Sequence, residues 1–513
     1  MADANELIKR FETLEGNRST WLTLWEEVAS YVLPHKGDFT TIRIQGDRSR
    51  TVHIYDSTAI HANHLLASHI HGAVTNPASA WFELRFRDAQ LNEDDEASAW
   101  LDDCRRRMLT AFADSSFDTQ VNELYQDLTC FGTSCMYVDW NDGLNFMVCH
   151  MSGVAIDENY SGVVDTVFHE RRMTARQIAQ RWPDVSTSRI KADLEKNPDR
   201  THRILHAVTP AGEVDYKKVI PDQPWKSCWI AVEDREILEE GGYFENPYLT
   251  PRWSKISNDC YGFSPALMAR PDIRTLNEAK RYELAAWEKS IDPPMMATAT
   301  GVISDLHMEA GAVTYVRDTN AIRPLTNYTD WNAAQIKSTE LQDSIRSIYH
   351  IDQLHIPERP NATATEVQIR YELMQRVLGP TMGRLQSEFL NPLIERTFGL
   401  MYRNGQFEQM PEILAGSDAD LDIQYQGPLA RSQRLADIQS IQRAVEVAMT
   451  LGQLDNSVVN VMDVEKAYRI ALDRIGIPAD AIRSTKDVEQ IKKQQEAQQQ
   501  AALQMQMANE QTG

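Results

Sequence analysis

Two long helical patterns that enclose a short β-like segment constrain the fold of this chain more than any other feature. Ser264-Pro265 is a favourable N-cap and N1 pair, and the helix that it starts must stop at Pro293-Pro294, because proline lacks the backbone donor and clashes with the preceding turn. A second helical pattern covers about 330–351, and small and β-forming residues lie between the two. Apolar residues recur at helical spacing, namely Ile273, Leu276, Leu284, Trp287 and Ile291 in the first pattern and Ile336, Leu341, Ile345, Ile348 and Ile351 in the second. This order predicts a stalk of two helices, the first roughly 40 Å long, with a small β insert at its end.

The remainder of the chain predicts an α+β fold that is mostly helical. Helices are expected over about 7–32, 56–75 (with Asp56 as N-cap), 93–113 and 118–130, and a strand at 81–86. From about 135 to 260 the apolar period is two, with strand candidates at 163–168, 203–208 and 228–232 and a helix at 174–182. Thr363 and Glu366 have the spacing of a capping box, which predicts a helix start after the proline-containing loop 352–361. Further helices are expected to Gly405 and over 430–475, followed by a Gln-rich tail at 486–513.

Charge and hydropathy exclude several functional classes. The 513 residues contain 52 Lys and Arg against 74 Asp and Glu, a net charge of −22, so broad electrostatic attraction to nucleic acid is not expected. No apolar run approaches the roughly 18 residues of a membrane span, and the N-terminus lacks the apolar core of a signal peptide. Six cysteines are too few for a disulfide scaffold in a chain of this length. We expect a protein made in the cytoplasm, with no membrane segment.

Sequence motifs give no indication of an enzyme. Neither phosphate-binding glycine pattern occurs, and there is no G-x-S-x-G turn and no H-E-x-x-H helix. The acidic run 93–96 fits the first turn of a helix, where its charges are stabilised by the helix dipole, and Arg105–Arg107 fit a solvated helix face. We therefore expect no catalytic residue, no metal and no cofactor.

Five histidines between residues 53 and 71 are the one group that could suggest a metal site. His61 and His64 are three residues apart on a predicted helix and share one of its faces. No cysteine or carboxylate stands at a matching spacing, so polar positions on an amphipathic helix explain these histidines better. The whole group is His53, His61, His64, His69 and His71. A metal-dependent enzyme built on them stays open as an alternative.

The order of these segments resembles the head-to-tail connector (portal) proteins of short-tailed bacteriophages. The resemblance covers about 1–475 and depends on the order and spacing of its segments rather than on one diagnostic motif. The segments that carry it are Arg18-Ser19-Thr20-Trp21 to Tyr31-Val32-Leu33-Pro34, Asp56-Ser57-Thr58-Ala59 through His71-Gly72 to Trp81-Phe82, Tyr261-Gly262-Phe263-Ser264-Pro265, Thr363-Ala364-Thr365-Glu366-Val367 with Arg370 and Glu372 to Glu388-Phe389-Leu390-Asn391-Pro392, and Gly427-Pro428-Leu429-Ala430.

This resemblance implies a portal-type fold and a ring, usually dodecameric, at one vertex of the capsid. The ring is the channel for genome packaging and ejection, and it docks the terminase and the tail adaptor. The major capsid and scaffolding proteins are further implied partners, and the implied location is the virion. The chain would then divide into a wing (1–263), two stem helices (264–292 and 329–351) with a clip between them (293–328), a channel loop (352–362), a long wing helix and its return (363–427), a crown (428–484) and the tail (485–513).

A channel must confine double-stranded DNA without holding it, and the charge of this chain suits that task. Each Lys or Arg that contacts a phosphate strengthens binding, and a ring multiplies every contact by the number of subunits. Only scattered bases lie near the presumed channel, which are Lys280, Lys289, Lys337 and Arg346. In the loop, the residues expected nearest the DNA are His355, Glu358, Arg359 and Asn361. The charge of −22 is also explained by solubility alone.

A helical scaffold or assembly protein of a virion that never conducts DNA is the second functional class. It would account for the helices and the acidity of the chain. It does not account for two stalk helices around a β insert.

Overall fold

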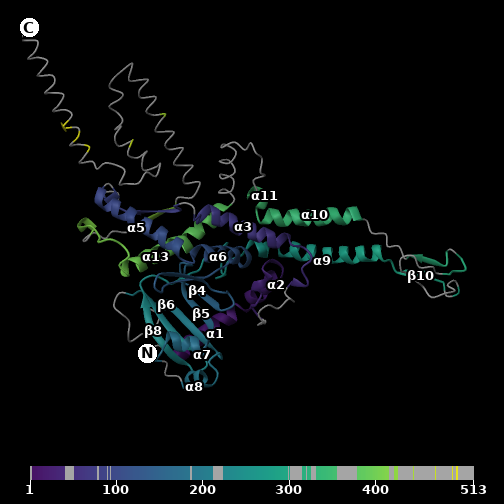
Figure 1. Ribbon diagram of the computed structural model, residues 1–513, viewed down its shortest axis with the longest axis horizontal. Coiled ribbons are helices and arrows are strands. Elements are labelled where there is room, and N and C mark those ends of the chain that lie inside the picture. Colours follow the sequence, from purple (N-terminus) through teal and green to yellow (C-terminus); the bar gives the residue numbers. More distant parts are fainter. Residues whose placement is uncertain are drawn as a thin grey trace, which may run out of the picture.

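The computed structural model describes most of the chain up to residue 425 (Figure 1). The described ranges are 3–40, 51–77, 80–88, 91–92, 94–184, 188–211, 223–298, 300, 315–318, 320–324, 331–354, 378–414 and 421–425, with a few isolated positions beyond them. The capping box at Thr363 and Glu366, the loop residues His355, Glu358, Arg359 and Asn361, and nearly all of the predicted crown and tail therefore lie outside the described residues.

Helices form the N-terminal part of the chain, as the sequence predicts, but the predicted helix over 7–32 is two helices that meet at Arg18. Asp3 caps α1 by accepting a hydrogen bond from the backbone N–H of Asn5, and Asp94 caps α5 by accepting from Glu96 and Ala97. Gly132 ends α6 with a left-handed φ of 79°. The bounds are α1 Ala4–Asn17, α2 Ser19–Val32, the 3₁₀ turn η1 Pro34–Lys36, α3 Thr58–Val74, α5 Asp95–Asp114 and α6 Phe117–Phe131.

The predicted cap of α3 was wrong by one residue. Ser57 occupies the N-cap position, and its side chain makes no capping hydrogen bond. Asp56 lies one residue earlier, where its carboxylate accepts a hydrogen bond of 2.8 Å from the backbone N–H of Thr58 and another of 2.8 Å from the Gln342 amide. Asp56 therefore links the start of α3 to a helix far along the chain.

The β-rich part contains a five-stranded antiparallel sheet in sequential order, β4-β5-β6-β7-β8. Leu7 and Phe11 of α1 cover one face of this sheet, and Ile178 of α7 and Ile190 of α8 cover the other. The three predicted strands and the predicted helix at 174–182 are confirmed, although each strand starts and ends differently from its prediction. The bounds are β4 Val154–Glu158, β5 Val164–Thr174, α7 Ala175–Arg181, α8 Ser188–Lys196, β6 Thr201–Pro210, β7 Trp225–Ala231 and β8 Glu236–Tyr243.

Three smaller sheets connect distant parts of the chain. β2 (Met136–Trp140) pairs with both β3 (Leu144–Val148) and β9 (Tyr248–Leu249). β1 (Phe82–Phe86) pairs antiparallel with β12 (Leu421–Tyr425), a strand that the sequence did not predict. β10 (Met295–Ala297) pairs with β11 (Ile322–Pro324) within the predicted β insert.

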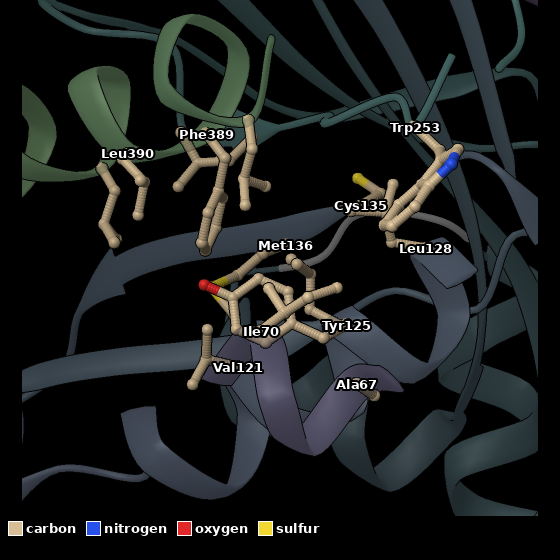
Figure 2. Close-up of a cluster of buried hydrophobic side chains, with 14 of the residues drawn as sticks. Ala67, Ile70, Val121, Tyr125, Leu128, Cys135, Met136, Trp253, Phe389 and Leu390 are labelled. Carbon is tan, nitrogen blue, oxygen red and sulfur yellow. The ribbon is translucent and has the colours of Figure 1, made fainter. Parts of the chain in front are cut away.

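The main hydrophobic core joins the N-terminal helices to the segment after residue 378. That segment includes one turn of π-helix, η3 (Gln386–Leu390), which continues directly as α13 (Asn391–Arg403), and a later 3₁₀ turn, η4 (Glu412–Leu414). Figure 2 shows Phe389 of η3 pointing toward the cluster formed by α3 and α6. The labelled side chains of this cluster are Ala67, Ile70, Val121, Tyr125, Leu128, Cys135, Met136, Trp253, Phe389 and Leu390.

The predicted stalk is confirmed as a pair of long helices. α9 (Pro265–Ile291) and α10 (Trp331–Ile348) lie side by side and project from the rest of the protein, with β10 beyond the end of α9 (Figure 1). The second helix ends earlier than the predicted residue 351, because His350 adopts a left-handed φ of 57°. A short helix, α11 (Ile351–Leu354), follows, so the start of the predicted loop is helical.

Candidate functional site

The stalk of α9 and α10 is the candidate functional site, and its base is fixed by close backbone contacts. The Ser264 hydroxyl accepts a hydrogen bond of 3.0 Å from the Leu267 N–H and donates one of 2.7 Å to the carbonyl of Cys130. A Cβ on Gly132 would lie 2.3 Å from the Gly262 carbonyl oxygen, and one on Gly262 would lie 2.2 Å from that of Gly132. Both positions therefore require glycine, which explains one segment that carries the family resemblance.

Polar contacts join the two stalk helices to each other and to the N-terminal part. The Ser338 hydroxyl donates to Glu283, and the Ser344 hydroxyl donates to Asp272 over 2.7 Å. Asn277 of α9 accepts from the Tyr55 N–H (2.8 Å) and donates to the His53 carbonyl (2.9 Å). These contacts hold the inner part of the stalk in one arrangement.

Three of the four predicted stem bases form ion pairs within their own helix. Lys280 lies 2.7 Å from Glu283, Lys337 lies 3.1 Å from Glu340, and Arg346 lies 2.8 Å from Asp343. All three pairs have i,i+3 spacing, and the pair of Lys337 is largely exposed. Lys289 is exposed and has no ion pair within the described ranges. The structure thus distributes the bases along the stalk and does not gather them into one basic patch.

The stalk as a whole carries little net charge. α10 holds two basic and two acidic residues, which are Lys337, Arg346, Glu340 and Asp343. α9 holds five basic and four acidic residues, which are Arg270, Arg274, Lys280, Arg281 and Lys289 against Asp272, Glu278, Glu283 and Glu288. Such a surface offers few unpaired cations to DNA phosphates.

A buried arginine that the sequence analysis missed joins the segment before α9 to the π-helical turn. The Arg252 side chain is 1% exposed, and its Nη2 lies 2.7 Å from Oε1 of Glu388. It also pairs with Glu158 at the end of β4 and donates to the carbonyls of Cys260 and Gly162, each over 3.0 Å. Burial alone would lower the pKa of Arg252, but the hydrogen bonds and charges of Glu388 and Glu158 outweigh burial and raise it.

Two further buried arginines act in the same way. Arg18, between α1 and α2, donates to the carbonyls of Met151 (2.9 Å) and Ser152 (2.7 Å) and so ties the N-terminal helices to the turn before β4. Arg396 of α13 lies 3.1 Å from Glu245. Arginine is ordinarily exposed, so the sequence did not predict the burial of either residue, and Arg18 was named only as the start of a segment that carries the resemblance.

A buried polar cluster lies inside the β-rich part. The imidazole of His206 stacks on Trp229 with ring centroids 3.8 Å apart, and its two nitrogens bond to the hydroxyls of Tyr248 (2.7 Å) and Ser227 (2.9 Å). Burial, followed by the charges of neighbouring basic groups, holds the pKa of His206 well below its ordinary value. Its neutral ring is therefore a structural element of the sheet.

The five histidines of residues 53–71 do not converge on one point. His71 lies 2.9 Å from Asp118, and the His53 ring packs edge-on against Tyr31. Among the residues that the structure describes, no three His, Cys, Asp or Glu side chains are placed to hold a metal ion.

Residues 94–96 of the acidic run have the role predicted from the sequence, whereas in the basic run only Arg106 is exposed as predicted and Arg105 and Arg107 are half-buried. Asp94 of the acidic run caps α5, and Asp95 and Glu96 occupy its first turn. Arg105 and Arg107 pair with acidic residues of α5, and Arg107 also lies 2.7 Å from Glu408.

All six cysteines are free thiols, with no disulfide bond. The helices in the described part of the chain include none with the length and apolar character that crossing a membrane requires.

Comparison with known proteins identifies the class to which this chain belongs. The family described as "Bacteriophage head to tail connecting protein" matches residues 4–482, so the chain belongs to that family. It is a phage structural protein with the role of a portal, or head-to-tail connector.

Two portal proteins are similar to this chain along nearly its whole length. The chain is 27% identical over 527 residues to the "Probable portal protein" of Bordetella phage BPP-1, covering 99% of this chain and 95% of the relative. It is also 27% identical over 527 residues to the "Portal protein" of Salmonella phage epsilon15, covering 98% and 93% of the two chains. A solved structure named "Neck of empty GTA particle computed with C6 symmetry" aligns with 13% identity and a TM-score of 0.37, over 77% of this chain and 90% of that chain.

Proposed function

We propose that copies of this chain close into a ring at one capsid vertex and that the stalks of α9 and α10 surround the channel for double-stranded DNA. The observation that carries this proposal is the projecting helix pair, whose bases are largely neutralised within their own helices. A ring repeats each unpaired cation in every subunit, so a strongly basic stalk would bind the duplex tightly. A nearly neutral stalk lets DNA move in both directions.

We also propose the division of the chain that the resemblance to portal proteins implies. Residues 264–292 and 329–351 form the stem, 293–328 the clip, 1–263 and 363–427 the wing, 428–484 the crown and 485–513 a tail. The β10–β11 pair lies in the clip, at the end of the stalk farthest from the wing (Figure 1). This position suits docking of the terminase during packaging and of the tail adaptor afterwards. The major capsid and scaffolding proteins would contact the ring within the virion, and the chain is synthesised in the host cytoplasm.

The residues of the loop 352–362 are proposed to lie nearest the DNA. α11 leads from the end of α10 into this loop, so the loop continues from a helix of the proposed channel wall. His355, Glu358, Arg359 and Asn361 are the proposed contact residues, with Lys280, Lys337 and Arg346 on the stem. Deletion of 353–360 is expected to impair packaging or retention of DNA in particles that still contain the ring. Unchanged packaging and retention would reject this role for the loop.

Light scattering of the purified full-length protein tests the ring itself. The proposal predicts a particle with many times the mass of one 58.5 kDa chain and a central hole in negative-stain images. A compact monomer or dimer, or a solid bundle of helices, would contradict it. Substitutions within 300–325 should impair terminase or adaptor docking while rings still form, and loss of the ring would count against the proposed clip.

A further inference from the structure

Three large apolar side chains in the outer part of α9 are exposed to solvent. Leu284, Trp287 and Ile291 are 49%, 58% and 65% exposed and follow one another at steps of three and four residues. They lie beyond the hydrophobic core of the chain, on the part of the helix that projects from the body (Figure 1). Contiguous apolar side chains on such a surface ordinarily mark a site of interaction. We call these three residues the α9 stripe.

The α9 stripe continues a face of the helix that is buried nearer the body. Glu283 contacts Ser338 of α10, so the direction of its side chain marks the side of α9 that faces α10. At 3.6 residues per turn, the residues of the α9 stripe lie about 40° to 100° away from Glu283 around the axis of α9. Ile273 and Asn277 lie in a similar direction, and both are buried. Asn277 is covered by the segment that contains His53 and Tyr55, to which it is hydrogen bonded. The same face therefore has cover from this chain near the body and none within the described residues farther out.

The opposite side of α9 also presents exposed side chains. Met268, Thr275 and Tyr282 recur every seven residues and lie about 60° to 100° from Glu283 in the other direction. Tyr282 is 63% exposed, and the Arg281 guanidinium lies over its ring, 4.7 Å from the centroid. α9 thus carries two different surfaces on its two sides.

Two unpaired charges extend this difference. Glu288 and Lys289 are both exposed, and neither forms an ion pair with a residue that the structure describes. The other basic residues in the outer half of α9 are paired, Lys280 with Glu283 and Arg281 with Glu278. Glu288 points toward the stripe side, and Lys289 points toward the Tyr282 side. Each side therefore offers a charge that complements the other side.

We propose that the α9 stripe of one copy packs against the Tyr282 side of α9 in the next copy, with Glu288 of the first facing Lys289 of the second. This contact rests on the proposed ring. A closed ring requires two different surfaces on each subunit, because every copy meets its two neighbours through opposite sides. Tyr282 and Leu284 lie at nearly the same height along α9, as do Glu288 and Lys289, so the helix supplies both surfaces there. The apolar stripe has no chemistry for DNA phosphates, and Lys289, predicted from the sequence to face the channel, belongs to the subunit contact instead.

Cysteine cross-linking of the full-length ring tests the contact. Tyr282 and Leu284 lie two residues apart, about 3 Å along the axis but on opposite sides of the helix, so they cannot form a disulfide within one chain. In the double variant Tyr282→Cys/Leu284→Cys, mild oxidation should join neighbouring copies and give a ladder of covalent multimers. Each single variant should give no ladder, because only one cysteine would then stand at each contact. Five of the six native cysteines are buried, which keeps the background low.

A charge exchange tests the complementarity independently. Glu288→Lys and Lys289→Glu should each shift particles from rings toward monomers, and the double variant Glu288→Lys/Lys289→Glu should restore the rings. Ile336→Ser is the matched control, because Ile336 is 61% exposed on α10 and points away from α9. It should leave the rings intact. Circular dichroism of every variant should match the wild type.

The outcomes separate this contact from the proposed function. If the wild type forms rings but the double cysteine variant gives no ladder, the proposed contact is wrong. The same conclusion follows if the double charge variant does not recover the rings. Neither result would contradict the ring itself. If the wild-type protein forms no ring at all, the proposed function fails, and the contact fails with it.

Discussion

The guanidinium of Arg252 is buried against the carboxylate of Glu388, with Nη2 and Oε1 2.7 Å apart. Arg252 belongs to the segment that leads into the stalk, and Glu388 belongs to the π-helical turn before α13. The pair therefore connects the projecting helices to a part of the chain that follows them by more than a hundred residues. A single turn of π-helix often occurs where a side chain must be placed for a specific task, and here it brings Glu388 to Arg252.

Glu388→Gln is expected to destabilise the protein by about 3 kcal/mol, because it leaves a buried guanidinium with one fewer charged partner. Chemical unfolding followed by tryptophan fluorescence measures the change. Glu340→Gln is the matched control, since its pair with Lys337 is largely exposed. It should cost less than about 1 kcal/mol. A similar small loss for both variants would show that the buried pair contributes little to folding.

Gly262→Ala is expected to prevent the close approach of the two backbone segments at the base of the stalk. The new Cβ would lie 2.2 Å from the carbonyl oxygen of Gly132, and neither backbone can move without disturbing α6 or α9. We expect a loss of stability of about 2–3 kcal/mol, because the added Cβ would overpack a tightly packed contact. Gly16→Ala in α1 is the control, because nothing lies within 4 Å of its added Cβ. It should stabilise the helix by roughly 0.5–1 kcal/mol, and equal effects of the two substitutions would contradict the contact.

Stability should fall as the pH drops below about 6.5, the ordinary pKa of histidine, because the unfolded chain then binds a proton that buried His206 does not. The sign follows from the lowered pKa of His206 in the folded state. Asp127 acts in the opposite direction, since burial raises its pKa to about 6. The variant His206→Gln isolates the histidine. Between pH 6.5 and 5.5 the wild type should lose more stability than this variant, by up to about 1 kcal/mol. Parallel pH profiles would show that His206 does not govern this dependence.

Removal of the acidic partners in α10 should increase the affinity of the ring for DNA. The double variant Glu340→Gln/Asp343→Asn leaves Lys337 and Arg346 without their ion pairs. If these bases line the channel, the ring of the variant should bind double-stranded DNA more tightly than the wild type. In a plot of the logarithm of the binding constant against the logarithm of the salt concentration, the slope should become more negative by about 0.9 for each new phosphate contact. Fluorescence anisotropy over a series of salt concentrations measures both quantities. Unchanged affinity and slope would place these bases away from DNA.

Local sequence signals predicted the stalk well. Ser264-Pro265 and the prolines after residue 292 set the limits of α9 because both act through the backbone of adjacent residues. The start of α3 was wrong by one residue, since Asp56 uses its carboxylate for a contact with Gln342 as well as for the turn. The end of α10 was missed because the left-handed conformation of His350 has no sequence signature.

Contacts between distant segments could not be predicted from the sequence. β1 pairs with β12, a strand more than 300 residues later in the chain. A single short strand such as β12 has too few residues to show a clear alternation of apolar and polar side chains in the sequence. Arg252 and Arg18 were missed for a related reason, because their burial depends on carbonyls and carboxylates that the fold supplies. For the site, the sequence indicated which bases lie on the stalk. It did not show that Lys280, Lys337 and Arg346 are neutralised within their own helices.

Single-particle imaging of the purified protein, to a resolution at which helices are visible, would show directly whether the stalks surround a channel. We expect a closed ring in which α9 and α10 of every copy surround a central opening wide enough for double-stranded DNA. Particles without such an opening, or rings whose stalks point away from the axis and leave it to other elements, would contradict the account.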